Sequence, residues 1–422
     1  MMFEGLWDEL VNDVWFKMTL LLAVAIASNF LFARLGQPKI IGQILLGILI
    51  GPSILGLITV SQSDPGDIVY RMAEFGAIIL LFMIGLECNM KDIYSKPAIV
   101  VATFGVIVPW VSGFFMAEWL LPTPGAGYSV FAQSVIIGAA LVATSVAITA
   151  GLMKELGVLG SKPAKLIIGA AVVDDILGMI VLAISSDLTA GNAISILNVA
   201  WIVIAAIVFV VAGALIGSRV VSKLIATVEL RGGKHKIPES GFLLALSFAF
   251  LYAVIAETIG ISAIVGAFVA GTSLAACKFN QHLRKRTEVL GWVFAPIFFL
   301  SLGILVDIWM SIDIWIFALI LTAVAFATKV IGCGIPARFF GFNNRESLAV
   351  GVGMAPRMEV AMVIALYGLS KEIINVDIYG VIILMGLLTA LFTPPFLKRL
   401  LKNVPRTEDR EPESQIEIGG GI

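Results

Sequence analysis

Apolar residues in this chain occur in long runs that are separated by short polar loops. Most runs are about 20 residues long, which is the length that an α-helix needs to cross the hydrocarbon core of a bilayer. The pattern predicts thirteen membrane-spanning helices, at residues 11–34, 39–58, 70–89, 97–121, 131–153, 161–186, 193–218, 241–258, 261–277, 289–308, 312–337, 346–369 and 376–400. We therefore expect an all-α membrane protein.

The composition agrees with this prediction. Hydrophobic residues make up 59% of the 422 residues, charged residues make up 14%, and the mean hydropathy is +1.02. A soluble domain carries about 25% charged residues, so the composition excludes a soluble protein. Residues 1–13 lack the basic stretch of a cleaved signal, and we expect the first span to be retained.

Lysine and arginine residues are divided unequally between the two sides of the predicted spans. Of the 28, 23 lie on the face that follows the odd-numbered spans, three lie near the other face, and two lie within spans. Because basic loops stay in the cytoplasm, we expect the N-terminus outside and the C-terminus inside the cell membrane. The basic loop 219–240 fits this role, so we expect no nucleic-acid partner.

The sequence contains a weak internal repeat. Residues 79–89 of the third span match residues 297–307 of the tenth at a shift of 218. In the second and ninth spans, the aligned residues are Gly47 with Gly266 and Gly51 with Gly271. A shift of seven spans turns one copy upside down relative to the other, so the pattern predicts two inverted six-helix repeats joined by a linker helix.

Two adjacent carboxylates, Asp174 and Asp175, lie near the middle of the apolar run 161–186. A charge at that depth costs roughly 3 kcal/mol, so two acids there indicate water, a cation or a basic partner. Consecutive side chains project about 100° apart around a helix, so the two cannot easily share one role. We predict an ion site here, at which protons and a hard cation compete for the carboxylate oxygens, although hydroxyl groups could also satisfy a structural pair.

The fifth and twelfth spans contain residues that disfavour a continuous helix. Residues 143–149 include the hydroxyls Thr144 and Ser145, and their counterpart in the repeat, 355–361, includes proline. Broken helices expose carbonyls and helix ends that form ion sites in transporters. Hydroxyl groups can also serve helix packing alone. We interpret Arg357 and Glu359 as structural neutralisers of the second break.

Lys329 lies roughly 12 Å deep in the eleventh span, eight residues from its end. It could extend to the membrane interface, or it could pair with one of the two aspartates. A buried lysine, unlike an arginine, can lose its proton. The second arrangement would let Lys329 take part in proton movement.

The sequence gives little support for a metal site, a disulfide framework or an enzyme active site. The two histidines and three cysteines form no ligand motif or disulfide framework. We find no nucleophile and base pair near the aspartates, so we expect a protein that is not an enzyme and holds no cofactor. The polar tail 403–422 is expected to be disordered.

Six motifs together resemble the sodium/proton antiporters of the second monovalent cation/proton antiporter family, the NapA-type and Kef-related proteins. They cover about residues 20 to 400: Gly36–Gln43 with Gly51-Pro-Ser, Leu81–Glu87, Ala143–Thr149, Val173-Asp-Asp175, Lys329 and Gly353–Glu359. One departure is Gln43, where many relatives have Glu. The resemblance implies a homodimer of NhaA/NapA-like fold, with two broken helices that cross in the core.

The resemblance also implies roles for single residues. Asp175 would carry the ion and the proton, Asp174 would pair with Lys329, and Thr144 and Ser145 would lie beside the ion. The implied division is a dimer domain, a core domain, a linker and a tail. Its segments are 1–96 (dimer), 97–190 (core, with the ion site), 191–240 (linker helix and loop), 241–310 (dimer), 311–402 (core) and 403–422 (tail).

We therefore predict an electrogenic antiporter that exchanges sodium, with lithium as a further candidate, for protons by alternating access. Its environment would be the lipid bilayer, with no soluble partner. A potassium/proton antiporter of the Kef-related branch would share these features. However, the chain has the Asp-Asp pair of the sodium branch and lacks the large nucleotide-binding domain of the Kef systems. A channel or ion-gated sensor would also contain buried acids, but its flux would not require protons to move in return.

Overall fold

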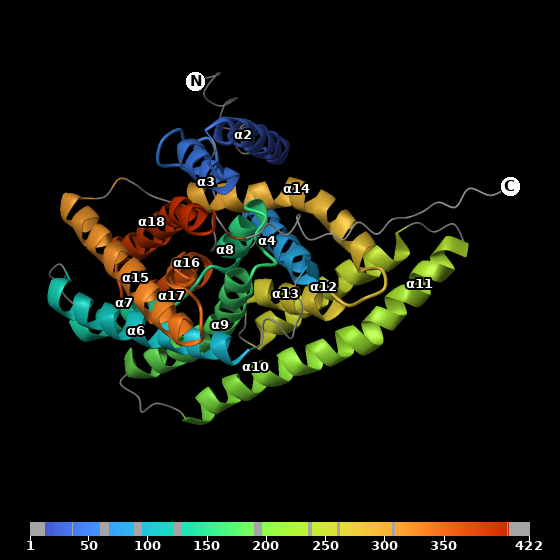
Figure 1. Cartoon of the computed structure of the whole chain (residues 1–422). Coiled ribbons are helices and arrows are strands. Elements are labelled where there is room, and N and C mark those ends of the chain that lie inside the picture. The colour runs from blue at the N-terminus through green and yellow to red at the C-terminus, as the bar shows by residue number, and fades with distance from the viewer. Residues whose placement is uncertain are drawn as a thin grey trace, which may run out of the picture.

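The computed structural model describes residues 13–35, 37–59, 67–87, 95–121, 129–189, 196–234, 239–259, 262–305, 309, 311–402 and 404. All regular elements in these residues are helical (Figure 1). They are α2 (Val14–Arg34), α3 (Lys39–Ile50), α4 (Ile68–Glu87), α6 (Lys96–Leu120), α7 (Val130–Ala140), α8 (Val146–Glu155), α9 (Lys162–Thr189), α10 (Ile196–Ile216), the π-helical turn η1 (Gly217–Val221), α11 (Ser222–Lys234), α12 (Ser240–Thr258), α13 (Ala263–Leu274), α14 (Asn280–Ile304), α15 (Ile312–Phe339), α16 (Asn344–Gly353), α17 (Glu359–Ser370) and α18 (Val376–Leu400).

Nine of the described helices are long and apolar enough to cross a membrane. They coincide with nine of the predicted runs, and α10, η1 and α11 together form one of them. The other four runs contain shorter helices: α3 and α13 stop early, and the fifth and twelfth runs are each divided into two helices. The chain is thus a multi-pass helical membrane protein. The count of thirteen spans stays a prediction.

The helices pack in two groups. In one, α4 and α3 contact α14, α4 also contacts α13, and α12 packs on α13. In the other, α6 contacts α7, α9 and α15, while α16, α17 and α18 pack around them. In Figure 1, α8 lies between the two groups, and the long helix of α10 and α11 runs past α9 of the second group and α13 of the first. The loop before α3 and the end of α8 lie where the groups meet.

Glycines allow close backbone contact at two equivalent places in the first group. A Cβ on Gly85 would lie 2.9 Å from Gly271 Cα, and a Cβ on Gly303 would lie 3.0 Å from Gly47 Cα. Gly85 and Gly303 are 218 residues apart, as the repeat predicts. Their partners, however, are Gly271 and Gly47, so the alignment of Gly51 with Gly271 is wrong by one helical turn. The similar Pro-Ser and Thr-Ser sequences that follow favoured the wrong match.

These contacts give a direct test of packing. Gly303→Ala would place a Cβ 2.0 Å from the Ile44 carbonyl oxygen, and overpacking of this kind costs about 1–3 kcal/mol. We expect a lower thermal unfolding temperature in detergent. Gly291→Ala on the same helix is the control, because its Cβ would meet only Met83, at 3.5 Å. Equal stability of the two variants would contradict the close approach of α14 and α3.

Candidate ion-binding site

Two helices are interrupted in the interior of the second group. The first break separates α7, which ends at Ala140, from α8, which begins at Val146. Ser145 begins α8, because its Oγ accepts the N–H of Ile148 at 3.3 Å. The second break, residues 354–358, separates α16 from α17 and contains a proline, which cannot donate a backbone hydrogen bond.

The two breaks contact each other and satisfy each other's backbone. The N–H of Ser145 donates to the carbonyl of Pro356 at 2.7 Å. The hydroxyl of Thr144 donates to Met354 O at 3.1 Å, and that of Thr149 donates to Gly353 O at 2.8 Å. The hydroxyls of the first break therefore stabilise the second. The hydrogen of Thr144 is used in this contact, while the lone pairs of its oxygen can still face a cation.

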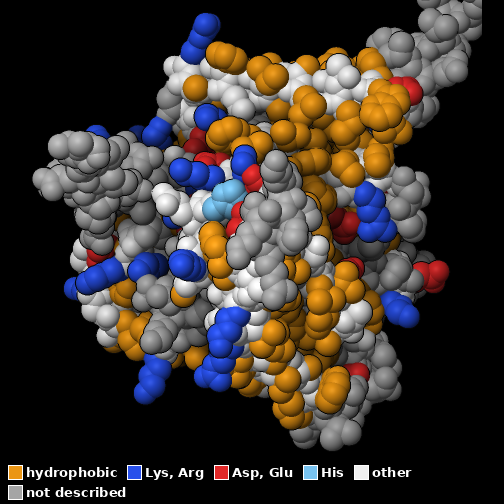
Figure 2. Space-filling model, turned by 90° about the vertical axis from the view of Figure 1, so that its right-hand side faces the viewer, with side chains coloured by type: hydrophobic (Ala, Val, Ile, Leu, Met, Phe, Trp, Pro, Cys, Tyr) orange, Lys and Arg blue, Asp and Glu red, His pale blue; other side chains and the backbone are white. Residues whose placement is uncertain are grey.

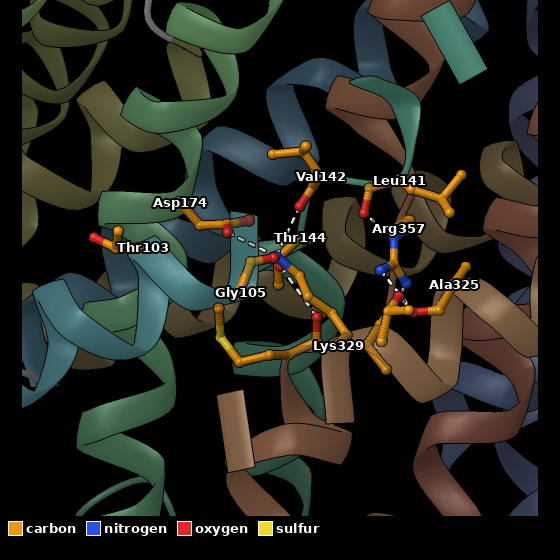
Figure 3. Close-up of polar contacts among 12 residues, drawn as sticks. Thr103, Gly105, Leu141, Val142, Thr144, Asp174, Ala325, Lys329 and Arg357 are labelled. Atoms are coloured by element: carbon orange, nitrogen blue, oxygen red, sulfur yellow. Dashed lines mark hydrogen bonds and ion pairs between the residues drawn. The ribbon is translucent and has the colours of Figure 1, made fainter. Parts of the chain in front are cut away.

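Lys329 lies fully buried in α15, and its ammonium group has three acceptors (Figure 3). Nζ donates to Asp174 Oδ1 at 2.7 Å, to Gly105 O at 2.8 Å and to Val142 O at 2.7 Å. All three N–H donors of the lysine are thus used. The alternative in which Lys329 extends to the membrane interface is wrong.

Asp174 and Asp175 occupy successive positions in the middle of α9. Both are buried, with exposed fractions of 0% and 6%. Asp174 faces Lys329, and its second oxygen, Oδ2, accepts no hydrogen bond from the described residues. Since neighbouring helix positions point in different directions, Asp175 cannot take the place of Asp174 in the ion pair.

Arg357 is the second buried cation near the breaks. Its guanidinium donates to the carbonyls of Leu141 and Ala325, each at 2.8 Å (Figure 3). It also donates to the Ala355 carbonyl at 2.9 Å. It therefore binds backbone oxygens of both breaks. Glu359 begins α17, but its side chain lies outside the described residues.

The four buried charged side chains of the described residues all belong to this region. They are Asp174, Asp175, Lys329 and Arg357. With both carboxylates ionised, the two negative charges balance the two positive charges. A cation that enters the site would add a buried charge, which is costly at this depth unless a proton leaves.

Sequence reasoning missed the backbone groups that bind Lys329. The Gly105 carbonyl is accessible because this residue has no side chain: a Cβ there would lie 2.5 Å from Cys333 Sγ and 3.6 Å from Lys329 Nζ. A glycine within a long apolar run was the only signal. Gln43, by contrast, lies outside the site. It is buried in α3 and donates to Asn29 Oδ1 of α2 at 2.9 Å.

Metal-binding residue types do not gather in the part of the chain that the structure describes. No group of three or more His, Cys, Asp or Glu side chains is close enough there to hold a metal ion. Cys277 and Cys333 are buried free thiols within those residues. Cys88 and His235 lie outside the described residues, and His282 contacts Glu239 at 2.9 Å.

Comparison with known proteins identifies the family. The model of the family described as sodium/hydrogen exchanger, transmembrane, matches residues 19–403. The chain belongs to this family. It is therefore a membrane transporter of the cation/proton antiporter type and not an enzyme, and its cargo consists of ions, with no cofactor implied.

Individual relatives align with this chain over almost their whole length. The Na(+)/H(+)-K(+) antiporter GerN of Bacillus cereus is 33% identical over 92% of this chain and 96% of the relative. A Na(+)/H(+) antiporter of Enterococcus hirae is 32% identical over 91% of this chain and 97% of the relative. Among solved structures, the sodium proton antiporter MjNhaP1 from Methanocaldococcus jannaschii matches with a TM-score of 0.62 and 18% identity, covering 92% of this chain and 97% of that chain. This last match supports the fold.

The buried ion pair can be tested by a double-mutant cycle. Asp174→Asn or Lys329→Gln alone leaves an uncompensated buried charge, and we expect each to lower the free energy of unfolding by about 3–5 kcal/mol. The double variant removes both charges. We expect its loss to be clearly smaller than the sum of the single losses, as measured by chemical unfolding in detergent. Additive losses would show that the two groups do not interact.

Proposed function

We propose that the protein is a sodium/proton antiporter in which sodium and protons compete for the buried aspartates. The observation that carries this proposal is the arrangement around α9. One aspartate is bound to a buried lysine, its neighbour is also buried, and both lie near two interrupted helices. Lithium, which like sodium is a small hard cation, is a further candidate cargo.

In this proposal Asp175 carries the transported ion. Replacing its proton with one sodium ion leaves the buried charge unchanged, so the two cargoes can alternate on one carboxylate. The oxygens of Thr144 and Ser145 and those of Asp174 would complete the sodium ligands, because hard cations prefer oxygen. Arg357 holds the carbonyls of the two breaks in place. Glu359 is assigned the same structural role on its position alone.

Lys329 would supply a second proton. A sodium ion that also binds Asp174 weakens the ion pair, and Lys329 would then be a buried cation with only carbonyl partners. Burial without a counter-charge disfavours the protonated form of a lysine. Release of this proton would give two protons for one sodium, which makes exchange electrogenic.

The proposed architecture follows the predicted repeats: thirteen spans, two inverted six-helix halves and a linker formed by α10 and α11. The helix group of α3, α4, α12, α13 and α14 would form the dimer domain of a homodimer, together with α2. The group around α6, α9, α15 and α18 would be the core domain, which moves as an elevator. The N-terminus would lie outside the cell membrane and the C-terminus in the cytoplasm, as the basic loops indicate.

Charged contacts join the two helix groups on the proposed cytoplasmic side. Lys154 at the end of α8 pairs with Glu87 at the end of α4, and Arg284 of α14 lies 3.4 Å from the same carboxylate. Glu155 accepts the backbone N–H of Lys39 at 2.5 Å, at the start of α3. Movement of one group against the other has to break these contacts, so they would favour the conformation seen here.

The carrier role of Asp175 is the first test. Asp175→Asn keeps the size of the side chain but removes the titratable carboxylate, and we expect it to abolish sodium-driven proton movement. A pH-sensitive dye inside proteoliposomes would measure the exchange. Asp187→Asn in the same helix is the matched control and should retain transport. Exchange at the wild-type rate in Asp175→Asn would refute the assignment.

The same assay separates the two cargo classes. Potassium replaces sodium in a second experiment. This comparison is needed because the relative GerN is described as a Na(+)/H(+)-K(+) antiporter. We expect protons to move across the proteoliposome membrane when sodium is added. A response to potassium alone would assign the protein to the potassium/proton antiporters, and sodium flux without proton movement would indicate a channel.

The contact between Lys154 and Glu87 tests the proposed domain movement. Lys154→Gln should shift the conformational equilibrium away from the described state by about 1 kcal/mol, or roughly fivefold, because one partly buried ion pair is lost. Distances between spin labels on α8 and α14 would measure the two populations. Arg71→Gln, which removes an exposed pair within α4, is the control. A single unchanged distance in both variants would contradict the movement.

A further inference from the structure

A cavity of about 590 Å³ lies at the end of α18, away from the buried aspartates. Its walls come from both helix groups, with Gln37 on the side of α3 and Leu156 and Val158 from the segment that follows α8. A smaller cavity of about 290 Å³ shares Gln37, Leu156 and Lys398 with it. Together they follow the seam between the two groups.

One side of the larger cavity is strongly basic. Lys398, Arg399 and Lys402 line it, and Arg345 reaches the same helix end, where its Nη2 donates to Arg399 O at 2.5 Å. Basic residues in a last turn also stabilise the negative end of a helix. Here, however, the three basic side chains line an open volume, which that role does not require. Figure 2 shows how Lys and Arg side chains are spread over one face of the molecule.

The remaining wall is apolar and continues toward the lipid. Pro395, Phe396, Leu401 and Val404 line it. Phe396 is 50% exposed and Phe392, one turn earlier in α18, is 46% exposed. In a membrane these two side chains would contact acyl chains. The cavity thus joins an apolar surface to a group of cations at the level where an apolar helix ends, which is the level of lipid phosphates.

We propose that this cavity binds the phosphate headgroup of an anionic phospholipid, with the acyl chains lying against Phe392 and Phe396. Basic pockets between spans on the cytoplasmic side are suited to such headgroups, and the cytoplasmic leaflet follows from the proposed orientation. The volume exceeds that of a free phosphate and lies within the range of organic ligand sites. A lipid bound here bridges the two helix groups.

Three other charged groups bear on this site. Lys154 lines the smaller cavity and is paired with Glu87. Glu155 lines the smaller cavity, but its carboxylate already accepts the N–H of Lys39 at the start of α3. The segment 405–422, which follows Val404 of the cavity wall in sequence, contains five acidic and two basic residues. Its carboxylates could pair with the cations, but its large apolar side chains are few, Ile416, Ile418 and Ile422, whereas acyl chains are wholly apolar. The apolar wall favours the lipid.

The test measures lipid retention by native mass spectrometry on the full chain in detergent. The probes are dioctanoyl phosphatidylglycerol, dioctanoyl phosphatidylcholine and inorganic phosphate. We expect the wild-type protein to retain phosphatidylglycerol preferentially. The triple variant Lys398→Gln, Arg399→Gln, Lys402→Gln should bind it at least about tenfold more weakly, since each cation near the phosphates contributes several-fold in affinity. Gln37→Trp, which fills the cavity without a charge change, should also weaken binding.

A matched triple variant controls for general surface charge. Lys223→Gln, Lys278→Gln and Lys285→Gln remove the same charge from exposed positions on the proposed cytoplasmic side, away from the cavity. Phosphatidylglycerol binding should be unchanged in it. An equal loss in both triple variants, or no loss in Gln37→Trp, would overturn the site. Equal occupancy by phosphatidylcholine, or displacement of phosphatidylglycerol by inorganic phosphate, would refute the proposal that the cavity binds an anionic phospholipid. Binding that appears only after deletion of 405–422 would assign the cavity to that segment.

Discussion

The backbone at the two helix breaks has to be satisfied within an apolar interior, and the rest of the site depends on this constraint. An unpaired backbone group in the hydrocarbon region costs several kcal/mol. Here the breaks are placed against each other, so that Ser145, Thr144 and Thr149 donate to carbonyls of residues 353–356. The two cations Lys329 and Arg357 bind further carbonyls, those of Val142 and Leu141 among them.

This arrangement links the structural and the chemical roles of the buried charges. Lys329 binds the Val142 carbonyl of the first break and also neutralises Asp174. A change of charge at Asp174 therefore alters the contact between Lys329 and the backbone of the break. Arg357 remains protonated at any physiological pH and has three carbonyl partners, which suits it for structure. Lysine, whose proton can be lost on burial, stands beside the aspartates. In the proposed mechanism Arg357 therefore has the structural role and Lys329 the proton-transfer role.

Much of the site was visible in the sequence because polar residues are conspicuous in apolar runs. The aspartates, Lys329 and the hydroxyl and proline segments were found in this way, and the structure brings them together around α9. Backbone acceptors such as Gly105 O and Val142 O have no signature of their own, so they were missed. The register of the glycine contacts was misjudged because matching apolar runs does not reveal which turns touch. The contacts of Lys154 with Glu87 and of Glu155 with Lys39, and the cavity at α18, involve segments far apart in the chain. Only the fold shows that these segments are neighbours.

In the proposed mechanism, sodium acts on the buried pair of Asp174 and Lys329, and the lysine gives up a proton. The most direct test compares the net charge moved per sodium ion after a sodium jump at symmetric pH, on a solid-supported membrane that carries proteoliposomes. The wild-type protein should move charge, whereas the paired variant Asp174→Asn, Lys329→Gln, which leaves no buried charge uncompensated at this pair, should exchange sodium for protons without net charge. The same charge per sodium ion in both proteins would show that Lys329 does not release the second proton.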